Sequence, residues 1–118
     1  MIPRSLAPIV KRYATAYPVV VVNGPRQSGK TTLVKAIFPD YGYCNLEAPD
    51  VREFARSDPR GFLAGLGDRA ILDEVQHVPE LFSYIQVAVD AVPTKGRFIL
   101  TGSQNFNMME RISQSLAG

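Results

Sequence analysis

The sequence predicts a three-layer α/β sandwich, in which helices cover both faces of a mainly parallel sheet. Two observations predict this fold. Short apolar runs recur along the chain, and a longer stretch with helical spacing of its apolar residues follows most of them. The 118 residues, 46% hydrophobic and 20% charged, are enough for one domain with its own core. We therefore expect a single domain over residues 1–118, with parallel strands joined by helical crossovers.

The chain begins with an expected amphipathic helix over about residues 5–15. Its apolar residues Leu6, Ile9, Val10 and Tyr13 recur at helical spacing. The core then runs from about residue 18 to 118, and its first strand is the β-branched run at about 19–23. Further strands are expected at 43–46, 69–73 and 97–101. A helix is expected after the glycine-rich turn that follows the first strand, ending at about residue 38, and further helices are expected at 49–57, 59–65, 79–92 and 107–116.

Two of these helices carry specific signals. Asp58 is a candidate N-cap, because Pro59 after it suits the first helical position. Leu81, Ile85 and Val89 are spaced to line one face of the helix at 79–92. The signals place short helices between the predicted strands, as a parallel sheet requires.

A glycine-rich turn joins the first strand to the next helix. It reads GPRQSGKT at residues 24–31 and matches the Walker A pattern G-x-x-x-x-G-K-[ST] of P-loop NTPases. Backbone N–H groups of such a turn, with the positive end of the following helix, bind phosphate. Lys30 would contact the β- and γ-phosphates, and the Thr31 hydroxyl would ligate Mg²⁺. The expected nucleotide-binding residues are Gly24, Pro25, Arg26, Gln27, Ser28, Gly29, Lys30, Thr31 and Thr32.

The third predicted strand ends in two carboxylates, which is the Walker B pattern. Asp73 at the end of the run Ile-Leu-Asp-Glu is expected to hold Mg²⁺ together with Thr31. Glu74 is expected to orient the attacking water and to take its proton. The two motifs together predict a catalytic site for ATP hydrolysis, with ATP and Mg²⁺ as its cofactors.

Polar residues also follow the fourth predicted strand. We expect Ser103 or Gln104 to sense the γ-phosphate or the attacking water, provided that this strand lies between the first and the third. Gln76 is a weaker candidate for contact with that water. His77 has no second histidine or cysteine near it at ligand spacing, so a metal role is not expected.

The bulk properties narrow the setting. A net charge of +2 is too small to indicate nucleic acid as a partner, although it does not exclude one. No apolar run approaches the length of about 20 residues that spans a bilayer. The single cysteine, Cys44, excludes an internal disulfide. With no signal-peptide pattern at the N-terminus, these features predict a cytoplasmic protein without a membrane partner.

Three phrases together resemble one family: GPRQSGKTTL at 24–33, ILDEVQHVPEL at 71–81 and FILTGSQNF at 98–106. They are similar to the predicted bacterial and archaeal AAA-superfamily ATPases whose ATPase core precedes a C-terminal domain of unknown function. The resemblance covers nearly the whole chain. It implies an additional-strand ATPase fold of the catalytic-glutamate type, an ATPase activity, and a role in driving or gating the C-terminal domain or another protein.

Members of that family continue past the point where this chain stops. The resemblance therefore implies a truncated domain that lacks the last strand, which would pair beside the first one, and the C-terminal domain. An open strand edge favours self-association. An arginine finger contributes about 10³–10⁵ in rate in related systems, and Arg26 and Arg111 are weak candidates. We therefore expect nucleotide binding with slow turnover.

Other functions remain open at this point. A nucleotide-gated interaction module would bind ATP without useful turnover, although an intact Glu74 favours hydrolysis. The run Asp-Glu-Val-Gln at 73–76 also resembles a helicase box, but the chain lacks a second motor domain and a basic stripe. A GTPase is disfavoured because no N-K-x-D motif occurs. A kinase transfers phosphate to a substrate hydroxyl. The paired acids Asp73 and Glu74 are more typical of sites where water attacks the phosphate, so a kinase is also less favoured.

Overall fold

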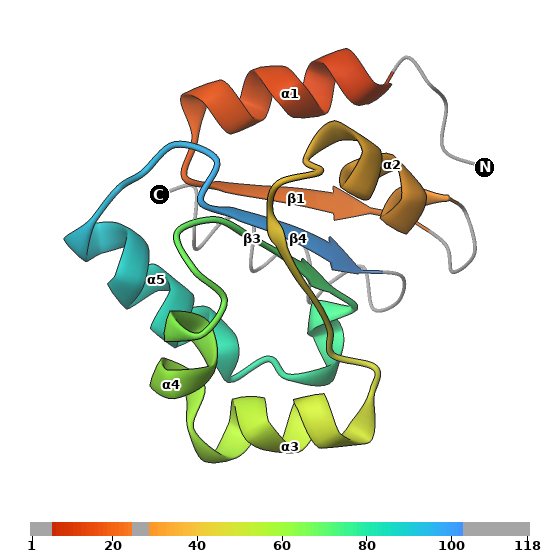
Figure 1. Ribbon diagram of the computed structural model, residues 1–118. Coiled ribbons are helices and arrows are strands. Elements are labelled where there is room, and N and C mark those ends of the chain that lie inside the picture. Colours follow the sequence, from red (N-terminus) through yellow and green to blue (C-terminus); the bar gives the residue numbers. More distant parts are fainter. Residues whose placement is uncertain (1–5, 25–28, 103–118) are drawn as a thin grey trace.

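The fold is built around a parallel sheet, seen in the computed structural model, which describes residues 6–24 and 29–102 (Figure 1). The described strands form one sheet in the order β1-β4-β3-β2, and every neighbouring pair is parallel. β4 thus lies between β1 and β3, as the sensor hypothesis requires. The strands are β1 (Val19–Asn23), β2 (Gly42–Asn45), β3 (Ala70–Asp73) and β4 (Phe98–Gly102).

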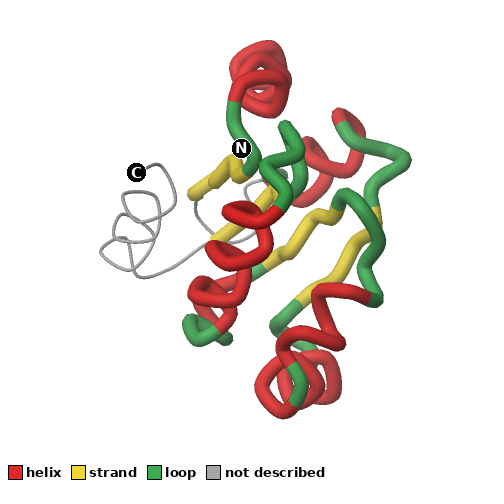
Figure 2. The backbone as a smooth tube through the Cα atoms, turned by 90° about the vertical axis from the view of Figure 1, so that its left-hand side faces the viewer, coloured by secondary structure: helices red, strands yellow, loops and turns green. Residues whose placement is uncertain are grey.

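Helices cover both faces of this sheet, which confirms the predicted α/β sandwich (Figure 2). α1 (Leu6–Ala16) and α2 (Lys30–Ile37) pack on one face. The other face is covered by α3 (Pro49–Ser57), α4 (Pro59–Ala64) and α5 (Leu81–Ala91). A single turn of 3₁₀ helix, η1 (Val75–His77), follows β3. The predicted helix at 107–116 falls outside the described residues.

The two central strands are buried throughout, which explains their continuous apolar sequence. Ile71 and Ile99 are register partners and pack toward α1 and α2. The residues next to them, Leu72 and Leu100, pack toward α4 and α5. Because successive side chains of a strand point to opposite faces, both central strands contribute to two cores at once.

α1 packs through a narrower face than its sequence predicts. Val10 and Ala14 are buried, but Ile9 is 41% exposed and Tyr13 is 49% exposed. The buried pair lies four residues apart, on the stripe that faces β1 and α2. The predicted apolar face was therefore half wrong: Tyr13 instead packs edge-on against exposed Tyr17, with ring centroids 5.9 Å apart.

The helix signals further along the chain are confirmed, with small shifts at the ends. The Asp58 carboxylate accepts a hydrogen bond from the Gly61 N–H, 3.1 Å away, and so caps α4. The α5 face of Leu81, Ile85 and Val89 is buried as expected. α5 starts at Leu81 and not at 79.

The amino-terminal edge of the sheet is tied together around Gly96, in the turn before β4. The Gly96 N–H donates to the Tyr17 carbonyl at 2.8 Å, and its carbonyl accepts from the Tyr41 hydroxyl at 2.7 Å. Gly96 has φ = 67°, and a Cβ atom there would lie 2.8 Å from the Ala14 carbonyl oxygen. Only glycine suits this position. The turn therefore links α1, β2 and β4 at the edge opposite to the polar strand ends.

Candidate functional site

Those predicted site residues that the structure describes lie at or near the carboxyl ends of the strands. β3 ends at Asp73 and β4 ends at Gly102, and α2, which begins at Lys30, packs on one face of the same sheet (Figure 1). Carboxyl edges of parallel sheets are where ligands bind in open α/β folds. The contacts of each side chain show how this edge is built.

Two glycines flank the phosphate-loop sequence. Gly29 has φ = 91° and ψ = 5°, a left-handed conformation that favours glycine, and it caps the N-terminus of α2. The Gly24 N–H donates to the Gly102 carbonyl at 3.1 Å, so the start of the loop is fixed to the end of β4. Residues 25–28, which include the predicted Pro25, Arg26, Gln27 and Ser28, lie outside the described residues.

Lys30 and Glu74 form a buried charge pair. The Lys30 Nζ atom lies 3.7 Å from Glu74 Oε1. Glu74 adopts φ = 58° and ψ = 49°, which is rare for a residue other than glycine, asparagine or aspartate. This backbone turn ends β3 and starts η1, and it leaves the carboxylate in reach of Lys30. Strain of this kind persists only where the surrounding structure holds it, and it clusters at functional sites.

Asp73 lies beside the first turn of α2. Its Oδ2 atom accepts a hydrogen bond of 2.7 Å from the Thr31 hydroxyl. The contact joins the Walker A and Walker B residues across 42 positions of sequence. The two predicted metal-binding side chains are therefore adjacent, as one shared ion requires. Thr32, also predicted to bind nucleotide, is exposed on α2.

Thr101 links the two acids, a role that sequence reasoning missed. Its hydroxyl donates to Asp73 Oδ1 and accepts from the Glu74 N–H at 3.1 Å. The side chain is fully buried at the end of β4. The predicted sensors Ser103 and Gln104 follow it directly but lie outside the described residues. A threonine inside an apolar strand looks like any β-branched core residue, so only the strand order shows its contact.

Tyr43 is a second site residue that sequence reasoning missed. Its hydroxyl donates to Asp73 Oδ2 at 2.7 Å, and Lys35 Nζ lies 3.8 Å from the centre of its ring. Burial, followed by the hydrogen bond to Asp73, raises the pKa of Tyr43 well above its usual range. The phenol is therefore a neutral donor.

The donor set fits Mg²⁺. That ion prefers oxygen ligands and binds proteins through one or two carboxylate or hydroxyl groups, with phosphate and water completing its shell. Thr31 and Asp73 would hold it. Within residues 6–24 and 29–102 no group of three or more His, Cys, Asp or Glu residues is placed to hold a metal ion.

Gln76 contacts the second acid. Its Nε2 atom donates to Glu74 Oε2 at 3.1 Å, so it lies beside the expected base. The His77 carbonyl accepts from Arg56, which fixes η1 to α3. Both residues therefore support the segment after β3.

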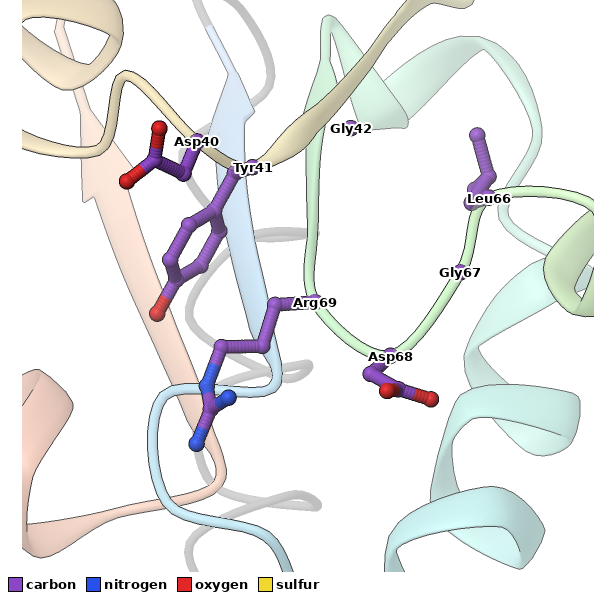
Figure 3. A pocket seen from close by; sticks show the side chains of 7 residues that line it. All are labelled: Asp40, Tyr41, Gly42, Leu66, Gly67, Asp68 and Arg69. Atoms are coloured by element: carbon purple, nitrogen blue, oxygen red, sulfur yellow. The ribbon is translucent and has the colours of Figure 1, made fainter.

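A pocket of about 560 Å³ lies at the opposite edge of the sheet (Figure 3). It is lined by Asp40, Tyr41, Gly42, Leu66, Gly67, Asp68 and Arg69. The side chains of Asp40, Asp68 and Arg69 point in different directions in the figure. Because polar groups converge at the carboxyl edge and not here, we assign the functional site to the carboxyl edge.

Comparison with known proteins agrees with this geometry. Residues 16–118 match the model of a family described as AAA domain. The chain is 35% identical over 116 residues to Uncharacterized protein Mb2031c of Mycobacterium bovis and to Uncharacterized protein Rv2008c of Mycobacterium tuberculosis. The match covers 98% of this chain and 26% of each relative, so the chain spans about a quarter of their length.

A solved structure shares the fold. Domain III of the replication initiation protein DnaA from Thermotoga maritima superposes with a TM-score of 0.58 at 17% identity, covering 92% of this chain and 56% of that one. This likeness supports the α/β architecture alone. Separately, no helix in the described part of the chain has the length and apolar character needed to cross a bilayer.

Proposed function

Because the chain belongs to the AAA domain family, we propose that it binds ATP with Mg²⁺ and hydrolyses it, and that hydrolysis drives or gates a protein partner or a C-terminal domain. Membership in this family indicates a nucleotide-binding, ATPase-type function. The specific activity, the metal and the partner are our proposal.

One observation carries it: the pairs Lys30–Glu74 and Thr31–Asp73 are connected through the Thr101 hydroxyl into one polar cluster at the carboxyl edge of the sheet. Lys30 would contact the β- and γ-phosphates, and Thr31 with Asp73 would hold Mg²⁺. The ion would neutralise charge on the phosphate oxygens when bound. Glu74 would orient the attacking water and accept its proton. Each group has a role that the others cannot fill.

The charge pair suggests how the site changes on binding. The Lys30 ammonium lies 3.7 Å from the Glu74 carboxylate. A triphosphate offers Lys30 more negative charge, so its side chain would turn to the phosphates. Glu74 would then be available to the attacking water. Hydrolysis would therefore require these two side chains to separate.

Isothermal titration of the chain with Mg-ATP, Mg-GTP and a DNA oligomer tests the proposal. We expect binding of Mg-ATP, weaker or no binding of Mg-GTP, and loss of measurable ATP affinity in Lys30→Ala. Lys11→Ala, which removes an exposed lysine of α1, is the matched control and should bind as the wild type does. Wild-type protein that binds no nucleotide would contradict the proposal, and salt-dependent DNA binding would favour the helicase alternative.

Turnover is a separate question from binding. Hydrolysis needs charge neutralisation in the transition state, and an arginine finger supplies about 10³–10⁵ in rate in related ATPases and GTPases. Such a residue usually comes from a neighbouring subunit or from another part of the chain. We therefore propose slow hydrolysis by this chain alone, and rapid hydrolysis by the purified chain would contradict that part of the proposal.

A further inference from the structure

We propose that Tyr43 is a positioning residue of the metal site, whose hydroxyl holds the Asp73 carboxylate in the orientation that binds Mg²⁺. The inference rests on the proposed function. It concerns a residue of β2, a strand that contains no residue of the Walker A or Walker B motif.

The strand register explains how Tyr43 reaches the site. Tyr43 is the register partner of Ile71, on the face of the sheet that α2 covers. Asp73 lies two residues further along β3, so its side chain points to the same face. A tyrosine is long enough to span this diagonal, and its hydroxyl ends 2.7 Å from Asp73 Oδ2. A shorter polar residue at this position would not reach the carboxylate.

The hydrogen bonds of Asp73 leave it little freedom to rotate. A carboxylate has about four acceptor positions on its two oxygens. Among the described residues, Thr31 and Tyr43 donate to Oδ2, and Thr101 donates to Oδ1. Counting only these described donors, one position on Oδ1 would remain for a water molecule from the shell of the ion. Thr31 can donate to Asp73 while its oxygen ligates the metal, so the three hydroxyls are compatible with a loaded site.

The ring of Tyr43 is held as well as its hydroxyl. Lys35 Nζ lies 3.8 Å from the ring centre, within range of a cation–π interaction. Lys35 and Thr31 belong to the same helix, α2, so ring and hydroxyl are both fixed relative to the phosphate-loop helix. Partners that orient a metal ligand in this way typically change metal affinity about 10–100-fold when removed.

The chain offers a matched control for a purely structural effect. Tyr41 lies two positions earlier, and its part-buried hydroxyl also donates a hydrogen bond of 2.7 Å, but to the Gly96 carbonyl at the opposite edge. Tyr41→Phe and Tyr43→Phe therefore remove the same atom from hydrogen bonds of equal length. Only the second bond involves the proposed metal site.

The test compares ATP affinity with and without Mg²⁺, measured by titration calorimetry in excess Mg²⁺ and in chelator. The ratio of the two affinities reports how strongly the protein couples metal to nucleotide. We expect Tyr43→Phe to bind ATP in chelator with the affinity of the wild type. The ratio of its ATP affinity in Mg²⁺ to that in chelator should be about tenfold smaller than the wild-type ratio. Tyr41→Phe should keep the full gain. Tyr43→Leu, which removes ring and hydroxyl, should lose at least as much as Tyr43→Phe.

Each other outcome has a definite meaning. If Mg²⁺ increases the ATP affinity of Tyr43→Phe as much as that of the wild type, the inference is overturned. The same result in Tyr43→Leu would overturn it if Tyr43→Phe does not fold. Equal losses in Tyr43→Phe and Tyr41→Phe would show a structural effect and also overturn it. Wild-type protein that binds no ATP would overturn the proposed function, and this inference with it. The chelator measurement thus separates the two failures.

Discussion

Lys30 Nζ and Glu74 Oε1 lie 3.7 Å apart in side chains that are only 4% and 8% exposed. A buried pair of this kind is costly to break from one side, because the remaining charge loses its partner without regaining water. The pair therefore connects the stability of the free protein to the residues that we expect to bind and hydrolyse ATP.

Glu74→Gln should preserve ATP binding and stop hydrolysis. Glutamine cannot accept a proton from water, and it leaves Lys30 without a carboxylate that competes with phosphate. We expect ATP affinity equal to or higher than that of the wild type, measured by calorimetry, and no phosphate release in a steady-state assay. Glu53→Gln, at an exposed position of α3, is the control. Normal turnover by Glu74→Gln would refute the assignment of Glu74 as the base.

Lys30→Ala should destabilise the protein even without nucleotide. It removes the ammonium that lies 3.7 Å from the buried Glu74 carboxylate, and breaking a buried pair from one side typically costs about 3–5 kcal/mol. Urea unfolding measures this loss. The double variant Lys30→Ala/Glu74→Gln should recover part of it, because an amide is less costly to bury than a charge. A double variant no more stable than Lys30→Ala would contradict the pairing.

Thr101→Val should weaken both stability and the site. Valine matches the shape of threonine but leaves the Glu74 N–H and one oxygen of Asp73 without this hydroxyl. An unsatisfied buried group costs about 1–3 kcal/mol. Thr101→Ser keeps the hydroxyl and should lose less. Urea unfolding and ATP titration of both variants provide the measurement, and equal behaviour of the two would argue against the bridge.

The sequence was sufficient for most of the elements and for four polar residues that the structure brings into contact at the carboxyl edge, Lys30, Thr31, Asp73 and Glu74. Strand runs, the Asp58 cap and the spacing in α5 are local signals, and the structure confirms them. Tyr43 and Thr101 could not be predicted in the same way. Their contacts with Asp73 depend on which strands are neighbours and in which register, and those are long-range properties of the sheet.

α1 shows a different limit of sequence reasoning. Leu6, Ile9, Val10 and Tyr13 form an apolar stripe wide enough to suit several orientations of the helix. Packing against β1 and α2 selects the part that contains Val10 and Ala14. Alanine gives a weak apolar signal in a sequence, but its small side chain allows the close approach of the helix.

The free energy of unfolding should decrease as the pH rises above about 9. Burial raises the pKa of Cys44 above its ordinary value of 9.0, so the unfolded chain loses the thiol proton before the folded one does. The stability present at lower pH is then lost as the pH approaches the folded-state pKa. Urea unfolding from about pH 8 to about pH 10 should show a shallower decline in Cys44→Ala than in the wild type. Parallel curves would contradict this.

The chain should self-associate at high concentration. β1 is an edge strand of the described sheet, pairing there only with β4. An open edge of a parallel sheet presents N–H and C=O groups to a second chain. Light scattering over a concentration series should show dimers or larger species, and a monodisperse monomer throughout would count against this expectation.

The hydrogen bonds around Gly96 have a mechanical consequence. They fasten the starts of three strands and the end of the first helix at one end of the molecule. A rearrangement triggered by phosphate would then be confined to the other end, where the four strands end at Asn23, Asn45, Asp73 and Gly102. The sheet would then stay rigid while the residues at its carboxyl edge move.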